Sequence, residues 1–324
     1  MTGPVFQRIA ILGAGLIGSS IARAAAERGA AASTTLYDCD PSVGERARAL
    51  GLGRICASAA EAAQDADAVF LCMPVGAMGR AAQELAGALK PGAILSDVGS
   101  VKASVARELE RAGLHEVHVI PGHPVAGTEK SGPEAGFASL FEGRWCILTP
   151  LANQGEDYAG AVARLASFWE QLGSRVETMD AERHDLVLAI TSHVPHLIAY
   201  NIVATAYDME SVTEGEVVKF SASGFRDFTR LASSDPTMWR DIFLNNREAV
   251  IEVLGRFSED LIALQRAIRW GQGEALFETF SRARGIRRAI IEAGQDTAAP
   301  NFGRDADKGS ADRGSADRES ADRG

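Results

Sequence analysis

A strand that runs directly into a glycine-rich turn and a helix opens this chain, and it restricts the possible folds more than any other feature. Residues 9–12 are apolar, residues 13–18 read G-x-G-x-x-G, and an Ala-rich helical pattern follows. Gly13 permits the tight turn, Gly15 lets a pyrophosphate approach the backbone, and Gly18 permits close packing of helix on strand. This context predicts a dinucleotide site at a helix N-terminus. The residues expected to hold the phosphates are Gly13, Gly15, Leu16, Ile17 and Gly18.

Asp38 ends the second predicted strand, twenty residues after Gly18. A carboxylate at this place accepts hydrogen bonds from the ribose diol of an adenine nucleotide and repels a 2′-phosphate. Residues 39–41 are Cys, Asp and Pro, so no Arg follows to bind such a phosphate. The sequence therefore favours NAD as the cofactor over NADP. The alternative is that Asp38 only caps the next helix.

The first half of the chain alternates short apolar runs with helical patterns, which is typical of βαβ units and a parallel sheet. Strands are expected at residues 8–12, 34–37, 68–73, 93–96, 117–120, 145–148 and 175–179. Helices are expected at residues 17–28, 43–50, 77–89 and 102–112. The fold class predicted for residues 1–180 is therefore α/β, with a Rossmann-type, doubly wound parallel sheet.

Beyond residue 180 the strand patterns stop, and residues 181–296 read as an all-α domain. Helical patterns cover residues 186–207, 241–269 and 273–291. The run 186–200 is apolar nearly all the way round, so it should be buried on every side. Because a small helical domain offers too little surface for this, we expect an obligate homodimer formed through this half.

Residues 297–324 have a different character, with the sequence Ser-Ala-Asp-Arg repeated at residues 310, 315 and 320. No large apolar residue follows Phe302. Such a segment cannot offset the entropy lost on ordering, so we expect a disordered low-complexity tail.

Composition limits the partners and the compartment. A chain of 324 residues suggests two domains. A formal net charge of −10 argues against nucleic-acid binding, which requires a basic surface. The four cysteines have no metal or redox spacing, and neither a leader sequence nor an apolar run of membrane-spanning length is recognised. We therefore expect a cytoplasmic protein without metal, nucleic-acid or membrane partners.

One histidine lies in a Gly/Pro-bounded loop at residues 122–132, just after the predicted strand 117–120. Such a loop would hold His123 at the carboxyl edge of the sheet, where open α/β sheets bind their ligands. The unperturbed pKa of an imidazole lies near neutrality, which suits general acid–base catalysis. The sequence therefore indicates His123 as a catalytic candidate.

Ser100 follows the neighbouring strand 93–96 and should lie near His123 at the same edge. The alternative is that Ser100 only caps the helix beginning near residue 101, since Ser is a preferred capping residue. Lys102 is interpreted as a residue on the face of that helix.

Polar residues interrupt the apolar helix beyond residue 186. Ser192 and His196 are four residues apart and should share one face. Pro195 cannot donate a backbone hydrogen bond and should kink the helix. Two histidines three residues apart, His193 and His196, lack the further ligands of a metal site. His184, which precedes this run, is interpreted as a structural residue of the domain junction.

An Arg-rich segment follows, G-F-R-D-F-T-R at residues 224–230 and D-P-T-M-W at residues 235–239. An Arg among aromatic side chains is the usual planar partner of a carboxylate. An alternative, a surface ion pair with Asp227, fits Arg226 better than Arg230.

These motifs occur in an order that resembles the prephenate/arogenate (cyclohexadienyl) dehydrogenases of tyrosine biosynthesis. The shared features are the glycine fingerprint, a G-S-V-K turn, the G-H-P-x-A-G-T-E loop, the S-H-x-P-H helix and the Arg-rich segment, over about residues 8–291. The resemblance implies that His123 is catalytic and that Ser100 supports it. It also implies a substrate site made of Ser192, His196, Arg230, Glu129, Asp227 and Trp239.

The reaction that the resemblance implies is oxidative decarboxylation of prephenate, arogenate or both, with hydride transfer to NAD. The products would be 4-hydroxyphenylpyruvate or tyrosine. One alternative is a β-hydroxyacid or imine dehydrogenase, but those use a Lys or Tyr of the helical domain. The other is an NAD-sensing regulator without chemistry, which predicts loss of the site residues. The sequence leaves the choice between prephenate and arogenate open, and equally any inhibition by tyrosine.

Overall fold

The computed structural model describes residues 3–128, 130–152, 155, 157–213 and 219–292. Glu129 and the tail predicted at residues 297–324 lie outside the described residues. The chain divides into two compact units, Met1–Leu254 and Gly255–Gly324, and each is described by itself.

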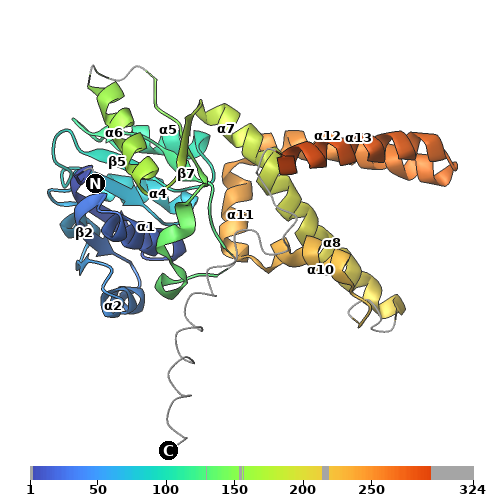
Figure 1. The fold of residues 1–324 in the computed structure, drawn as a ribbon, viewed down its shortest axis with the longest axis horizontal. Coiled ribbons are helices and arrows are strands. Elements are labelled where there is room, and N and C mark those ends of the chain that lie inside the picture. Colours follow the sequence, from blue (N-terminus) through green and yellow to red (C-terminus); the bar gives the residue numbers. More distant parts are fainter. Residues whose placement is uncertain (1–2, 129, 153–154, 156, 214–218, 293–324) are drawn as a thin grey trace, which may run out of the picture. The chain divides into compact units, whose positions relative to one another are not determined.

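A six-stranded parallel sheet forms the centre of the first unit (Figure 1). The strand order is β3-β2-β1-β4-β5-β6, so the order reverses between β1 and β4. Open α/β sheets bind ligands at such a switch point, outside the carboxyl ends of the strands. The strands are β1 (Phe6–Leu12), β2 (Ala31–Tyr37), β3 (Arg54–Ile55), β4 (Ala68–Leu71), β5 (Ile94–Asp97) and β6 (His118–Val119).

Helices cover both faces of this sheet, as the prediction of a doubly wound fold requires. The alternation of side chains along β4 shows this, because Phe70 belongs to one buried cluster and Val69 and Leu71 to the other. Phe70 packs on Phe168 of α6 with ring centroids 5.1 Å apart. The helices are α1 (Leu16–Glu27), α2 (Pro41–Ala49), α3 (Ala59–Ala63), α4 (Val75–Glu84), α5 (Ala103–Arg111) and α6 (Tyr158–Gln171).

A second, three-stranded sheet follows the first and differs from the expectation of one parallel sheet. It contains β7 (Gly122–Pro124), β8 (Trp145–Leu148) and β9 (Arg175–Thr178). β7 is antiparallel to β8, whereas β8 and β9 are parallel. The prediction of a loop at residues 122–132 is therefore wrong for its first three residues, Gly122–Pro124, which form a strand. Two short 3₁₀ turns, η1 (Pro133–Ala135) and η2 (Ala138–Phe141), lie between β7 and β8 in the chain and pack against α1.

The helical part of the first unit begins with α7 (Ala181–Leu188), a π-helical turn η3 (Ala189–His193) and α8 (Val194–Thr213). The π-turn lies directly before Pro195, where the missing N–H leaves the preceding turn without its regular partner. Further along are α10 (Ser223–Thr229), η4 (Arg230–Ser233) and α11 (Pro236–Asn245).

α12 (Arg247–Arg269) runs from the first unit into the second. The single helix predicted for residues 241–269 is wrong, because α11 and α12 are separated at Asn246. The backbone of Asn246 leaves the helical region at φ −109° and ψ 36°. Its buried side chain donates a hydrogen bond to the Asp185 carbonyl oxygen, a tertiary contact that local sequence does not reveal.

The apolar helix is not buried on every side within the single chain. Within residues 186–200, Ile190 is 54% exposed, and Leu186 and Val187 are about two-fifths exposed. By length and composition alone, the segment Ala181–Met209 could cross a membrane, and 28% of its most apolar window is buried. The expectation that no apolar run reaches that length is therefore wrong.

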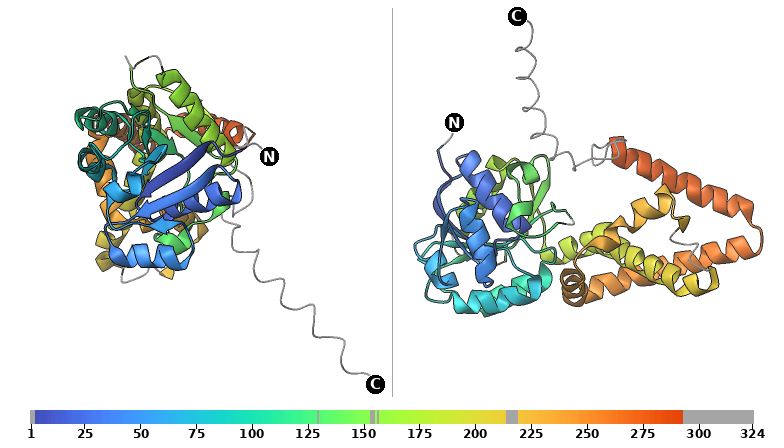
Figure 2. Two further views of the ribbon diagram at one scale, coloured as in Figure 1. Left: turned by 90° about the vertical axis from the view of Figure 1, so that its left-hand side faces the viewer. Right: turned by 90° about the horizontal axis from the view of Figure 1, so that it is seen from below.

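The second unit contains the end of α12 and α13 (Gly273–Glu292), joined by a short turn at Gly271 (Figure 2). Gly271 has φ +65°, a conformation that glycine adopts without strain. Large apolar side chains of both helices are exposed, among them Leu261, Ile262, Phe277 and Phe280.

Candidate active site

His123 and His184 are in direct contact. His123 lies in β7, just beyond the carboxyl end of β6, and is 7% exposed. Its Nδ1 is 2.8 Å from Nε2 of His184 on α7. Nδ1 of His184 is in turn 2.8 Å from Oδ1 of Asp185. His184 is therefore part of the site, a role that the sequence interpretation missed; the signal that could have revealed it is the adjacent His-Asp pair.

Burial keeps these two histidines neutral. It lowers the pKa of His123 well below its usual 6.5, and the nearby His184 and Lys102 lower it further. Burial likewise lowers the pKa of His184, to about 2. A neutral imidazole carries one unprotonated nitrogen, which is what a general base needs.

Asp185 caps the helix that follows β5. Its Oδ1 accepts a hydrogen bond of 2.7 Å from the backbone N–H of Lys102, and its Oδ2 accepts one of 2.9 Å from Ala103. α5 begins at Ala103, so Lys102 occupies its N-cap position, and no side chain at that position caps the helix. The alternative that Ser100 caps this helix is therefore wrong. Ser100 lies half-buried in the turn between β5 and α5.

Lys102 is fully buried at the N-cap position of α5, so its interpretation as a helix-face residue is wrong. Its ammonium group forms an ion pair with the buried carboxylate of Asp97 and donates a hydrogen bond of 2.7 Å to the Gly122 carbonyl oxygen. Asp97 also accepts hydrogen bonds from the backbone N–H groups of Gly99 and Gly122. This pair therefore connects the turn after β5 to the strand that carries His123.

Burial acts on the pKa values of the pair in opposite directions. It lowers the pKa of Lys102 and raises that of Asp97, while the attraction between the two charges opposes both shifts. A charge left here without its partner would have no water to solvate it.

His196 stacks on Trp239, which connects α8 to α11. The ring centroids are 3.7 Å apart and the planes are inclined by 22°. Nδ1–H of His196 donates to the Ser192 carbonyl oxygen at 2.9 Å, in keeping with their expected common face. Burial lowers the pKa of His196, and the positive charge of Arg230 lowers it further, so Arg230 lies near this ring.

The side chains of Arg226, Asp227 and Arg230 are exposed. Within the described part of the chain, no salt bridge joins Arg226 to Asp227, so the alternative surface pair does not form. The structure thus places Arg230 near His196. Among the described residues, no hydrogen bond or salt bridge joins Asp227 to the other predicted substrate residues.

Asp241 is a further residue that the sequence interpretation missed. Its carboxylate accepts a hydrogen bond of 2.8 Å from the backbone N–H of Gly76, in the first turn of α4. A Cβ on Gly76 would lie 2.6 Å from an Asp241 oxygen, so only glycine permits this approach. Trp239 and Ile242 of the same helix belong to the buried cluster under the sheet, with Met78.

The glycine fingerprint has the predicted geometry. Gly13 has φ +103°, and a Cβ on Gly18 would lie 2.0 Å from the Gly13 carbonyl oxygen. By contrast, a Cβ on Gly15 would meet no atom within 4 Å, so space remains in front of the α1 N-terminus. α1 has no side-chain cap and no acidic residue in its first turn, so its free N–H groups suit a phosphate.

Asp38 lies beside this loop. Its carboxylate accepts hydrogen bonds from the backbone N–H groups of Ala14, at 2.8 Å, and Asp40, at 3.0 Å. The cap of α2 is Asp40, whose side chain accepts from Ser42 N–H. The alternative that Asp38 only caps the next helix is therefore wrong.

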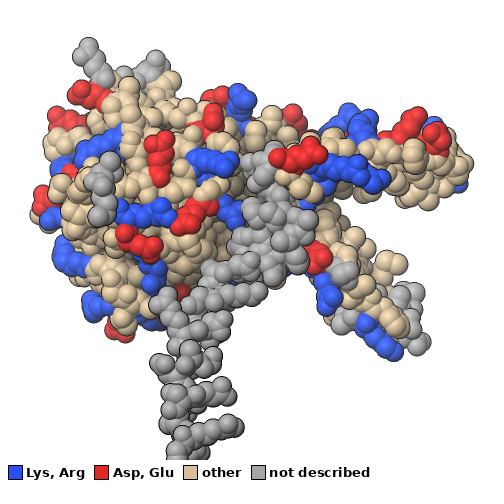
Figure 3. Space-filling view, in the orientation of Figure 1, with Lys and Arg blue, Asp and Glu red and all other residues tan. Residues whose placement is uncertain are grey.

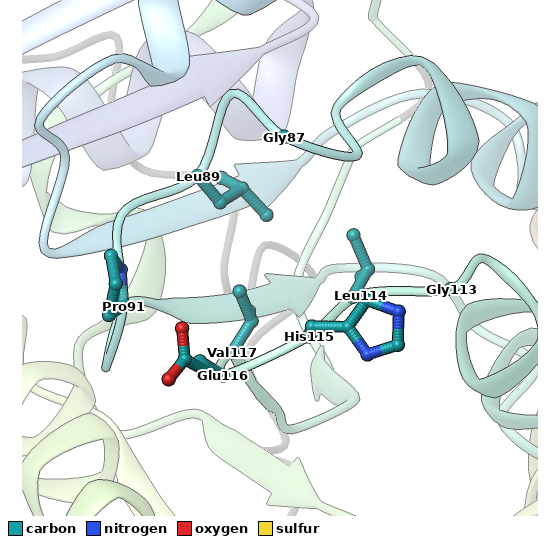
Figure 4. A pocket seen from close by; sticks show the side chains of 8 residues that line it. All are labelled: Gly87, Leu89, Pro91, Gly113, Leu114, His115, Glu116 and Val117. Atoms are coloured by element: carbon teal, nitrogen blue, oxygen red, sulfur yellow. The ribbon is translucent and has the colours of Figure 1, made fainter.

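A small cavity of about 220 Å³ opens at the opposite edge of the sheet (Figure 4). Leu89, Leu114 and Val117 line it, in segments that precede β5 and β6. It is therefore far from the carboxyl ends at which Asp97 and His123 lie. Among the described residues, no three His, Cys, Asp or Glu side chains are grouped to bind a metal ion.

Together, the doubly wound sheet, the glycine fingerprint and the buried histidine at the carboxyl edge define a dinucleotide-dependent dehydrogenase. Two family profiles agree with this class. The profile described as "Prephenate dehydrogenase, nucleotide-binding domain" matches residues 21–178, and "Prephenate dehydrogenase, dimerization domain" matches residues 180–282. The chain belongs to the prephenate dehydrogenase family.

Individual relatives cover most of this chain. A cyclohexadienyl dehydrogenase of Zymomonas mobilis is 44% identical over 287 residues, which are 88% of this chain and 97% of that protein. The crystal structure of Aquifex aeolicus prephenate dehydrogenase with hydroxyphenyl propionate and NAD⁺ is 35% identical, with a TM-score of 0.80, and covers 88% of this chain and 98% of that one. Synechocystis arogenate dehydrogenase is 26% identical with a TM-score of 0.74, over 87% of this chain and 99% of that one.

The buried ion pair generates a prediction about stability. Lys102→Met should lower the free energy of unfolding by about 3–5 kcal/mol, because it leaves Asp97 buried and unpaired. The double variant with Asp97→Asn should recover much of this loss. Urea unfolding measures the stability of both variants.

The control is Arg80→Ala, which removes an exposed pair with Glu84 and should cost no more than about 0.5 kcal/mol. A loss in Lys102→Met as small as the control's would contradict the structural role of the pair.

Proposed function

We propose that the chain catalyses the NAD-dependent oxidative decarboxylation of prephenate, arogenate or both. The products are 4-hydroxyphenylpyruvate or tyrosine, together with carbon dioxide and NADH. The observation that carries this proposal is the buried, neutral His123 at the carboxyl edge of the dinucleotide-binding sheet. The names of the relatives from Zymomonas mobilis and Synechocystis support it.

The fingerprint residues fit NAD. Backbone N–H groups at the start of α1 face the open space beside Gly15, where a pyrophosphate would lie. We assign this contact to Gly13, Gly15, Leu16, Ile17 and Gly18. The carboxylate oxygens of Asp38 keep lone pairs for the ribose hydroxyls. When bound, NAD supplies the hydride acceptor.

In this proposal His123 accepts the proton of the ring hydroxyl as the carbinol carbon loses its hydride. Ser100, in the neighbouring turn, supports His123. Departure of the ring carboxylate as carbon dioxide makes the ring aromatic, which drives the step. The protein therefore needs mainly to orient the substrate, accept one proton and exclude water.

The substrate contacts in the proposal come from the helical part. Arg230 binds a substrate carboxylate, and its proximity to His196 supports this. Ser192 and His196 line the pocket. The residues proposed to shape or gate it are Trp239, Asp227 and Glu129.

We also propose a cytoplasmic homodimer in which residues 1–180 bind the nucleotide and residues 181–296 form the interface. Large apolar side chains of α8 and α13 are exposed in the single chain, as an unpaired interface would leave them. The apolar segment Ala181–Met209 then contacts a second copy rather than lipid, because it carries the buried polar residues His184, Asp185 and His193. Acidic and basic side chains are interspersed on the face in Figure 3, which offers no extended basic surface for nucleic acid.

The decisive assay follows NADH formation by purified protein with NAD, comparing prephenate with arogenate. Activity with either substrate supports the proposal, and the ratio of kcat/KM values gives the preference. Absence of NADH with both substrates, while NAD still binds, would overturn the proposal.

His123→Asn should lower kcat by about 10²-fold or more, because a general base is lost. Binding of NAD, measured by protein fluorescence, should persist and serves as the control for folding. Turnover equal to that of the wild type would remove His123 from its assigned role.

Arg230→Ala should raise KM by about 10- to 100-fold, since a hydrogen bond to a charged group contributes about 1.5–3 kcal/mol. Steady-state kinetics measure this. Arg226→Ala, one helical turn earlier, is the matched control and should leave KM much closer to the wild-type value. An unchanged KM in Arg230→Ala would rule out the proposed anchor.

A further inference from the structure

We propose that Asp185 and His184 are positioning residues that fix the tautomer of His123, so that its Nε2 is the unprotonated, proton-accepting atom. This inference rests on the proposed function only in taking His123 as the base. Its geometric foundation is the chain of contacts from the start of α5 through Asp185 and His184 to His123.

The direction of the hydrogen bonds is set at Asp185. Both of its oxygens already accept backbone N–H groups at the start of α5, where the helix dipole also favours negative charge. Burial raises the pKa of Asp185 above its usual value, and these two hydrogen bonds and the charge of Lys102 oppose that rise. Each oxygen of Asp185 thus already has a backbone N–H donor, and two such donors at the start of a helix stabilise the ionised carboxylate, which can only accept. Asp185 is therefore an acceptor toward His184.

The second contact follows from the first. His184 is neutral and carries one ring hydrogen, since burial lowers its pKa to about 2. That hydrogen must be on Nδ1, because two lone pairs would otherwise face each other across the 2.8 Å contact with Asp185. Nε2 of His184 is therefore an acceptor.

The third contact fixes His123. Nε2 of His184 accepts, so Nδ1 of His123 must donate across their 2.8 Å contact. His123 is neutral too, so its only ring hydrogen is on Nδ1. The lone pair of His123 is consequently on Nε2.

Neighbouring elements hold this chain of contacts in place. Asn246, which separates α11 from α12, donates to the Asp185 carbonyl oxygen at 2.9 Å and lies 3.0 Å from Nδ1 of His193. On the other side, the Lys102–Asp97 pair binds both backbone groups of Gly122, next to His123. Neither histidine can therefore rotate without breaking contacts of several elements.

The consequence for catalysis is an oriented base. When the substrate hydroxyl transfers its proton to Nε2, the new positive charge on His123 is stabilised through the Nδ1–H bond toward His184 and Asp185. The Nδ1 proton stays on His123, so no further proton transfer is needed. A buried Asp is known to hold a catalytic His in its reactive tautomer in hydrolytic triads, and here a second imidazole lies between them.

The tautomer can be read directly from nitrogen–proton correlation spectra of histidine-labelled protein. The chain has six histidines, and the His123 signals are identified by their loss in His123→Asn. The expected result for the wild type is a protonated Nδ1 and an unprotonated Nε2 on His123. A proton on Nε2 of His123 would overturn the inference, whatever substrate the enzyme oxidises.

Two variants test the effect on catalysis. His184→Leu removes the acceptor and should lower kcat by about 10- to 100-fold, with a mixture of His123 tautomers and little change in KM or NAD binding. His184→Gln keeps an amide oxygen as acceptor and should retain more of kcat and the Nδ1–H tautomer.

Equal kcat in wild type and both variants would overturn the inference. If His184→Leu does not fold, the spectrum of the wild type still decides. Loss of activity in His123→Asn together with full activity in both His184 variants would leave the proposed function standing and reject this inference alone.

Discussion

The carboxylate of Asp185 binds the start of α5, and much of the site depends on this contact. Asp185 belongs to the first helix beyond the predicted nucleotide-binding region, whereas α5 belongs to the α/β sheet. One side chain therefore satisfies two free helical N–H groups and also holds His184 against His123. The link from Asp241 to the first turn of α4 repeats this arrangement at the neighbouring helix. Side chains of the helical part thus bind free N–H groups at the starts of α4 and α5, which have no side-chain cap of their own.

A buried charge pair lies behind the catalytic histidine. Lys102 and Asp97 are both fully buried, and such pairs seldom add net stability compared with apolar residues of the same size. Instead, this pair holds Gly122 in place, because it binds both the N–H and the carbonyl of that residue. The strand that carries His123 has only three residues, too few to be held by its ladder alone. The pair therefore supplies the rigidity that a short strand lacks.

Sequence patterns predict the features that depend on neighbours along the chain. The glycine fingerprint, the alternation of strands and helices and the family resemblance all agree with the fold. Features that depend on distant partners are missed. The burial of Lys102 is not apparent from the sequence, because charged residues seldom lie inside a protein and its partners Asp97 and Gly122 come from other elements. His184 contacts a residue 61 positions away, and β3 is too short for a recognisable pattern.

The π-helical turn at Ala189–His193 lies between His184, which contacts His123, and His196, which stacks on Trp239. A π-turn accommodates one residue more than a regular helical turn, and each helical residue rotates the chain by about 100°. Removing one residue from this turn would rotate all of α8 and carry His196 away from the face of Trp239. Relatives that keep this site should therefore keep the spacing of twelve residues between His184 and His196, even where the amino acids between them differ.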